Sequence, residues 1–139
     1  MKWSSTRVLA AAAITATVWV VGCSHEQKSL STGAFIESHA QLENRRQNAE
    51  QISNGSVRND ALRSVALDAA SQGVGDVAIN ATAEIDRPSL RDETAEQCAR
   101  LLEDMGERAA AEKLADSISD TEARDRVRSY LASHTPPSK

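Results

Sequence analysis

Three arginines recur at a fixed spacing and could form one chemical surface. Arg58, Arg91 and Arg124 are separated by intervals of 33 residues. A guanidinium group binds a carboxylate through two parallel hydrogen bonds, so a row of arginines would suit a carboxylate-rich partner or the carboxyl terminus of a peptide. The alternative, which we favour, is a set of weak and solvated ion pairs between repeats. The aspartates available for such pairs are Asp86, Asp92, Asp120 and Asp125.

No other group of residues has the spacing that catalysis or metal binding requires. His25, His39 and His134 lie far apart, so no two of them have ligand spacing. Neighbouring acids such as Asp92 and Glu93 point apart on a helix, and a solvated face explains them. The sequence contains no glycine-rich phosphate loop and no nucleophile motif. We therefore predict no enzyme activity, no cofactor, no metal and no small-molecule substrate.

The two cysteines have different surroundings. Cys98 lies among apolar residues at helical spacing, which predicts a buried core thiol. Cys23 follows the uncharged residues 8–21, and Lys2 and Arg7 precede them. A bilayer core requires roughly 20 helical residues, so residues 8–21 are too short to span it comfortably. A positive head, a short apolar core and a small-residue exit predict a signal peptide over residues 1–22.

The residues before the cysteine, Val20, Val21 and Gly22, resemble with Cys23 the lipobox of bacterial lipoproteins. The resemblance implies cleavage between Gly22 and Cys23, a diacylglyceryl group on the Cys23 thiol, and acylation of the new amino terminus, for example by palmitate. A plain secreted protein and an uncleaved short anchor are the alternatives. Two or three acyl chains anchor a protein stably where one does not. We therefore expect an exported protein of the bacterial cell envelope, held by lipid, and in a Gram-negative cell on the outer membrane facing the periplasm.

The charge of the mature chain disfavours nucleic acid as a partner. Two of the 16 basic residues lie in residues 1–22, which leaves 14 against 20 acidic residues, a net charge of −6 where the whole chain has −4. Such a chain repels phosphate backbones. Both tryptophans also leave with the signal, so a stacking platform for bases is not expected.

The mature chain divides into a tether and one helical domain. Residues 23–34 are polar and small and predict a lipid-anchored flexible tether. Residues 35–133 have helical periodicity, beginning with an apolar stripe of Phe35, Leu42, Ala49 and Ile52. The turn residues 53–56 end that helix, and we expect Ser56 to cap the next one. Residues 134–139 contain two prolines and predict a disordered tail.

The helical domain contains an internal repeat. Residues 56–88 and 89–121 align at an offset of 33 residues without gaps, and a third, partial copy follows. Each copy predicts a helix pair, with Gly106 ending the first helix of the second copy and Ser89 with Asp92 close to a capping box. A helix pair cannot bury its own apolar face, so stacking on the next pair stabilises it. The apolar stripes are Leu62-Val65-Ala66-Ala69 and Ala95-Cys98-Ala99-Leu102, with small residues Ala66, Ala99 and Ala132 at one shared position.

The spacing of these repeats resembles that of tetratricopeptide repeats. The matching positions are Gly73-Ala78-Ile85 and Gly106-Ala111-Ile118, with Ala66 and Ala99 as the close-packed small residues. The departures are aliphatic residues at the aromatic positions of that family, a repeat one residue shorter, and no proline at its usual place. The resemblance implies a protein-binding scaffold and names no ligand. A HEAT-like helix pair and a plain helical bundle stay open.

Together these observations predict an all-α protein of short antiparallel helix pairs that form a small α-solenoid or bundle. We expect it to act as a scaffold or adaptor for an envelope protein partner, held at the membrane through Cys23. The alternative is a structural helical bundle that acts as a spacer or as a subunit of an envelope assembly. Residues Arg58, Arg91 and Arg124 are the candidate ridge for the partner.

The small residue at the shared repeat position provides a direct test of the predicted helix contact. Replacing Ala99 with phenylalanine should lower the free energy of unfolding by roughly 1–3 kcal/mol, because the added ring overpacks the contact between neighbouring helices. Thermal or urea denaturation measures this change. An unchanged melting temperature would contradict the close contact at Ala99.

Overall fold

The computed structural model describes residues 37–134, and these residues form helices joined by short turns. The helices are α1 (His39–Glu50), α2 (Gly55–Ser71), α3 (Gly75–Ala83), α4 (Pro88–Asp104), α5 (Arg108–Ser117) and α6 (Thr121–Ser133). The predicted all-α fold is confirmed. None of these helices is both long enough and apolar enough to cross a membrane.

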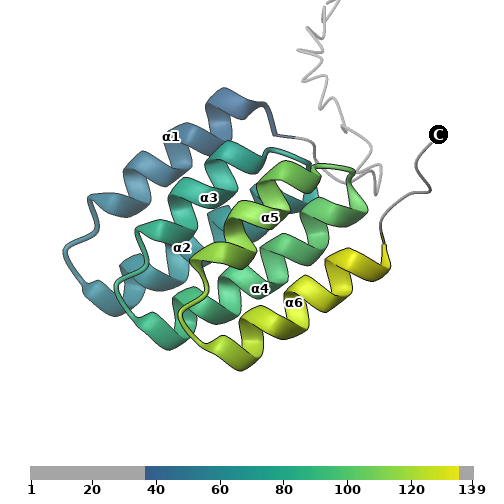
Figure 1. Ribbon diagram of the computed structural model, residues 1–139. Helices are drawn as coiled ribbons and strands as arrows, with labels where there is room; N and C mark the ends of the chain where they lie inside the picture. The colour runs from purple at the N-terminus through teal and green to yellow at the C-terminus, as the bar shows by residue number, and fades with distance from the viewer. Residues whose placement is uncertain (1–36, 135–139) are drawn as a thin grey trace, which may run out of the picture. The chain divides into compact units, whose positions relative to one another are not determined.

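The helices stack in two rows, and each contacts only its near neighbours. Figure 1 shows α1, α3 and α5 side by side in one row and α2, α4 and α6 in the other. Within residues 37–134, every helix contacts the next helix and the second next helix along the chain, and none contacts a more distant one. Because α1 and α6 do not meet, the stack is open at both ends, as in a helical solenoid rather than a closed bundle.

The 33-residue repeat is present in the backbone itself. The residues that precede α2, α4 and α6 are Asn54, Arg87 and Asp120, which are 33 residues apart. Gly73 and Gly106, at equivalent places in the turns of the two helix pairs, have φ angles of 73° and 81°. A residue with a Cβ rarely adopts this left-handed conformation, so glycine ends both helices.

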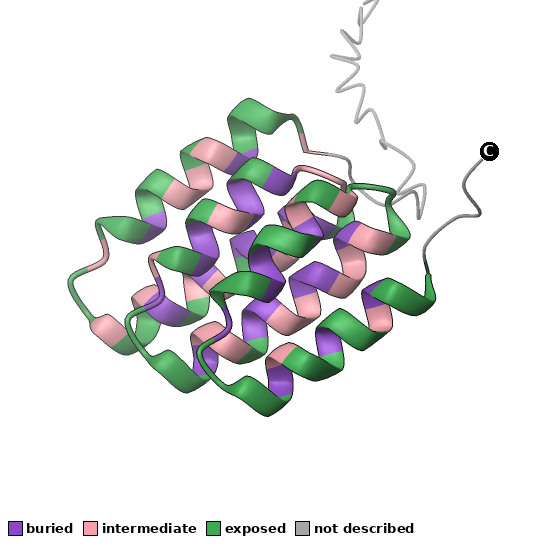
Figure 2. Ribbon diagram, viewed as in Figure 1, coloured by how far each residue is buried: buried purple, intermediate pink, exposed green. Residues whose placement is uncertain are grey.

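The predicted apolar stripes form the core. Leu62, Ala66 and Ala69 of α2 are fully buried, and so are Cys98, Ala99 and Leu102 of α4. Figure 2 shows buried residues along the sides of the helices where the two rows meet. The expectation that each pair buries its apolar face against its neighbours is therefore confirmed, as is the burial of Cys98.

The helix starts differ from the predicted ones. Asn54, rather than Ser56, caps α2, because its Oδ1 accepts hydrogen bonds from the backbone N–H groups of Ser56 (3.1 Å) and Val57 (3.2 Å). Helix α4 begins at Pro88, before Ser89, since a proline needs no hydrogen-bond acceptor for its nitrogen in the first helical turn. The predicted capping box of Ser89 and Asp92 is therefore wrong.

The ends of the helical domain also differ in part from expectation. Helix α1 begins after Ser38, which forms a capping box with Gln41, and Ile52 lies beyond the end of this helix. Ala132 is exposed, unlike Ala66 and Ala99 at the same repeat position. Phe35, the signal peptide, the lipobox, the whole tether and residues 135–139 lie outside the described residues.

A close approach of α3 and α5 gives a test of the stacked arrangement. A Cβ atom on Gly75 would lie 2.5 Å from the Cβ atom of Ala110. Gly75→Ala should therefore lower the free energy of unfolding by roughly 1–3 kcal/mol in urea denaturation. Gly55, also the first residue of its helix, is the matched control, since a Cβ there meets only the Arg58 guanidinium at 4.0 Å. Equal stability of the two variants would contradict the close approach.

Candidate functional site

Arg58, the first of the three repeated arginines, is held by two neighbours. Its guanidinium forms an ion pair with Asp86, in the turn after α3, and donates a hydrogen bond to the carbonyl oxygen of Ile52 (3.4 Å). The Asp86 side chain is 62% exposed, so this pair contributes little to stability. Arg58 thus pairs with one of the aspartates expected from the sequence, but both residues lie in the repeat of residues 56–88, so the pair is within a repeat rather than between repeats.

The other two arginines do not have this partner. The position equivalent to Asp86 in the next repeat holds Ser119, which has no charge to offer Arg91. Within residues 37–134, neither Arg91 nor Arg124 forms an ion pair. The Nε atom of Arg124 is buried and has no hydrogen-bond partner. The structure therefore does not make the three arginines equivalent, and a binding ridge of all three stays a prediction.

The side chain of Asp92 is hydrogen-bonded to backbone N–H groups. Its Oδ2 accepts hydrogen bonds from the N–H groups of Ser119 (3.1 Å) and Asp120 (3.0 Å), in the turn before α6. Asn59, at the same repeat position, accepts a hydrogen bond from the N–H group of Asp86 (3.1 Å). This position therefore holds the turn at the end of its own repeat, which leads into the next one, a role that was not predicted from the sequence.

Ion pairs also join the helices of the row that contains α2, α4 and α6. Arg63 of α2 pairs with Glu93 of α4 (2.7 Å), and Glu96 of α4 pairs with Arg126 of α6 (3.3 Å). Glu96 occupies the repeat position of Arg63, so the sign of the charge is reversed from one contact to the next. Because these side chains are partly exposed, we expect them to set the order of stacking more than its stability.

Tyr130 of α6 is the only tyrosine, phenylalanine or tryptophan of the described residues. The guanidinium of Arg100 lies 5.0 Å from the centre of its ring, and the ring of His134 lies 4.1 Å away. The hydroxyl group donates a hydrogen bond to Asp104 (2.9 Å), and this carboxylate raises the pKa of Tyr130. The side chain of Tyr130 therefore makes its contacts within the described domain.

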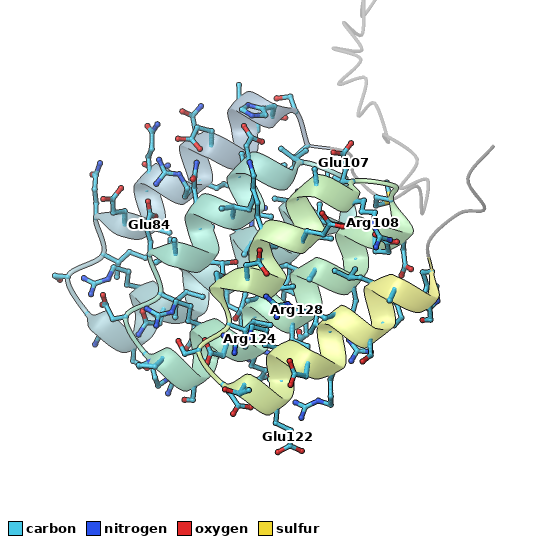
Figure 3. The ribbon with its side chains drawn as sticks, viewed as in Figure 1. Glu84, Glu107, Arg108, Glu122, Arg124 and Arg128 are labelled. Atoms are coloured by element: carbon cyan, nitrogen blue, oxygen red, sulfur yellow. The ribbon has the colours of Figure 1, made fainter. Side chains whose placement is uncertain are left out.

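A groove runs between α5 and α6 at the last edge of the stack. Its volume is about 270 Å³, and it is lined by Arg108, Glu112, Ala115, Asp116, Arg128, Leu131 and Ala132. Arg128 of α6 pairs with Asp116 of α5 across it (2.8 Å). At the other end, Arg108 donates a hydrogen bond to the carbonyl oxygen of Leu131 (2.9 Å). Figure 3 shows Arg124 and Arg128 near each other on α6, and Arg108 farther away on α5.

A second hollow, of about 480 Å³, lies over the first turns of α3 and α5. Nε2 of His39 lies 2.7 Å from Oδ2 of Asp76 at its rim. The carboxylate raises the pKa of His39, and the hydrogen bond to His39 lowers the pKa of Asp76. The stabilisation from this pair is present while His39 is protonated and is lost as the pH rises through the folded-state pKa. Both side chains are more than half exposed, so the effect is small.

The described residues have no group of three side chains able to hold a metal ion. The large hydrophobic residues exposed among them are Val57 and Met105, which lie on different helix pairs. The surface of the described domain therefore offers charged and polar groups rather than a broad apolar patch.

The groove between α5 and α6 was not predicted from the sequence. The repeat alignment nevertheless contains a signal for the groove. Arg128 occupies the repeat position at which the earlier helices have the buried residues Leu62 and Ala95. A charged residue at an otherwise apolar repeat position indicates a helix side that no further helix of residues 37–134 covers.

No protein-family model, no curated protein and no solved structure matches this chain. Its function must therefore be inferred from the residues and from their arrangement.

The burial of Cys98 gives a test of its assignment as a core residue. Burial raises the pKa of the Cys98 thiol to about 12, so the thiol is protonated at neutral pH. We expect Cys98 to react with a disulfide reagent such as DTNB only after unfolding, and at a rate that follows global unfolding. Rapid modification of the folded protein at neutral pH would indicate that Cys98 is accessible and would contradict this assignment.

Proposed function

We propose that this protein is a lipid-anchored scaffold of the bacterial cell envelope, which holds a partner protein near the membrane. The proposal rests on the lipobox-like residues Val20 to Cys23 and on the open stack of helix pairs. No catalytic step is part of it.

The proposed anchor follows from the position of the cysteine. Acylation of the Cys23 thiol and of the amino group left by cleavage would give two or three acyl chains. At about 0.8 kcal/mol per buried methylene group, that number holds a protein at a membrane stably. Residues 23–34 would then separate the helical domain from the lipid by a distance on the order of 18 Å, if they behave as a random coil.

The proposed scaffold role is supported by how the helices stack. Because each described helix contacts only its first and second neighbours, no described helix covers the outer sides of the two rows or the two ends of the stack. This arrangement gives a small domain a large surface for a partner. The exposed surface is mainly polar, so we expect recognition through charge and hydrogen bonding, and an interface that forms reversibly.

One observation favours the structural alternative. The side of α1 that faces away from the stack contains polar residues, among them Asn44, Gln47 and Asn48, which suits a domain that ends there and needs no partner. The protein would then act as a spacer, or as a subunit of an assembly through other surfaces.

The role of Cys23 is testable in the native envelope. We expect the full-length protein to enter the detergent phase in a detergent partition experiment, and Cys23→Ser to remain in the aqueous phase or to accumulate with its signal uncleaved. Cys98→Ala is the matched control, because it removes the other cysteine and should leave the partition unchanged. A wild-type protein that is cleaved correctly and stays in the aqueous phase would refute the lipid anchor.

The scaffold role is tested by crosslinking in the envelope followed by purification. A different protein that co-purifies with the wild type, and is lost with Cys23→Ser, supports the scaffold. Recovery of only the protein itself, in defined multiples, favours the structural alternative.

A further inference from the structure

We propose that the edge formed by α5 and α6 binds one amphipathic helix of a partner protein, with small residues on its inner face and a carboxylate at its C-terminal end. This inference deepens the proposed scaffold function and rests on it. The partner helix would take the place on α6 that α3 has on α2 and that α5 has on α4.

The contacts between helices identify this edge. Helix α2 is packed by α3, and α4 is packed by α5, the helix that follows each of them. Helix α6 is the third helix of the same row and contacts only α4 and α5 among the described helices. The side of α6 that would receive a following helix therefore forms the edge of the described stack, together with α5.

One helix face is buried in α2, the first helix of this row, and the equivalent face is exposed in α6, the last. Positions four residues apart lie on one helix face, so Leu62 and Ala66 share a face of α2, and Arg128 and Ala132 share the equivalent face of α6. Leu62 and Ala66 have 0% exposure. The Arg128 side chain is 55% exposed, and Ala132 is exposed as well. In α2, the following helix, α3, covers part of this face. In α6, the equivalent face borders the groove between α5 and α6.

Arg124 extends this stripe by one turn and indicates the charge of the occupant. The equivalent Arg58 receives the carboxylate of Asp86, which comes from the turn after the following helix, α3. Arg124 has no ion pair within residues 37–134, and its Nε atom is buried without a hydrogen-bond partner. Leaving a buried donor unpaired is unfavourable. A carboxylate just after the docked helix would pair with the Arg124 guanidinium, as Asp86 pairs with Nη2 of Arg58.

The groove can admit a helix at small cost. Ala115 and Leu131 provide apolar surface in its lining. The ion pair between Arg128 and Asp116 crosses it, but these side chains are 55% and 66% exposed. Exposed pairs of this kind contribute little to stability, so a docking helix can displace this one. Small residues on the incoming helix are required for a close approach, as Ala78 and Ala81 provide in α3.

A second copy of this chain does not supply a suitable helix. The helix at the free end of another copy is α1, and its residues equivalent to Ala78 and Asp86 are Arg45 and Ser53. Arg45 is bulky and already pairs with Glu37 and Asp68. Helix α1 therefore lacks both the small residue and the carboxylate, and we assign the edge to a different protein.

The test uses a helix of known fit as the probe. A synthetic peptide of residues 74–87 contains α3, its small residues and Asp86. An isolated helix of this length is marginally stable in water, so we expect weak binding, with a Kd on the order of 0.1–1 mM. Titration of the full-length, isotope-labelled protein in detergent micelles, followed by NMR chemical shifts, measures binding in this range. The shifts should be confined to α5 and α6.

Charge exchange identifies the role of Arg124. Arg124→Glu should weaken binding of the peptide by about fivefold or more, since the pair is lost and the peptide carboxylate is repelled. A peptide with Asp86→Arg should bind Arg124→Glu better than it binds the wild type. Arg91→Glu is the matched control, because Arg91 has the same repeat position on α4 and does not lie at the edge. Ala132→Glu, which adds bulk and charge to the groove, should also weaken binding, and circular dichroism confirms that each variant is folded.

The outcomes separate this inference from the scaffold function. Absence of any peptide binding, shifts located on α1 or α3, or equal binding by Arg124→Glu and Arg91→Glu would overturn the helix-docking inference. A partner that still co-purifies from the envelope in that case leaves the scaffold proposal standing. Peptide binding at α5 and α6, with only self-association in the envelope, would support the edge as a helix acceptor and remove the scaffold proposal.

Discussion

The close packing of small residues between helices is the constraint on which the whole domain depends. Within residues 37–134, eleven of the 23 buried hydrophobic residues are alanines, and no aromatic residue or methionine is among the others. Alanine lets helix axes approach closely, but each side chain removes little apolar area from water. A single helix pair therefore gains too little to be stable alone, and stability must come from the contacts between successive pairs. The open, nearest-neighbour stack is the direct result.

This constraint explains which parts of the fold are visible in the sequence. The apolar stripes, the 33-residue offset and the turn glycines all repeat, because each pair meets nearly the same surroundings. The helix starts were predicted wrongly, since Asn54 and Pro88 each satisfy the first turn by a different local mechanism that the repeat does not share. The cap that the sequence suggested at Ser89 failed because α4 already begins at Pro88 and because Asp92 binds the turn at the end of its own repeat.

The candidate binding residues were only partly predictable for a related reason. The sequence correctly offered Asp86 as a partner of Arg58, but it could not show that Asp92 would be occupied by backbone N–H groups. The difference between Arg58 and Arg124 depends on whether another helix of the chain packs next to theirs, and not on the residues near them in the sequence. Repeat equivalence therefore predicts residues inside the stack better than residues at its ends, where the neighbour changes.

The ends of the stack are also where binding and stability are coupled. Among the described helices, α6 contacts α4 and α5 whereas α4 contacts four helices, so the last of these helices has fewer helix neighbours than the helix beside it in the row. In a nearest-neighbour stack, a helix added at an end stabilises mainly the helix beneath it. A partner at this edge would therefore order α6 more than α1. Helix α1 and the α5–α6 edge lie at opposite ends of the described array, so a partner at this edge would leave the contacts of α1 with α2 and α3 unchanged.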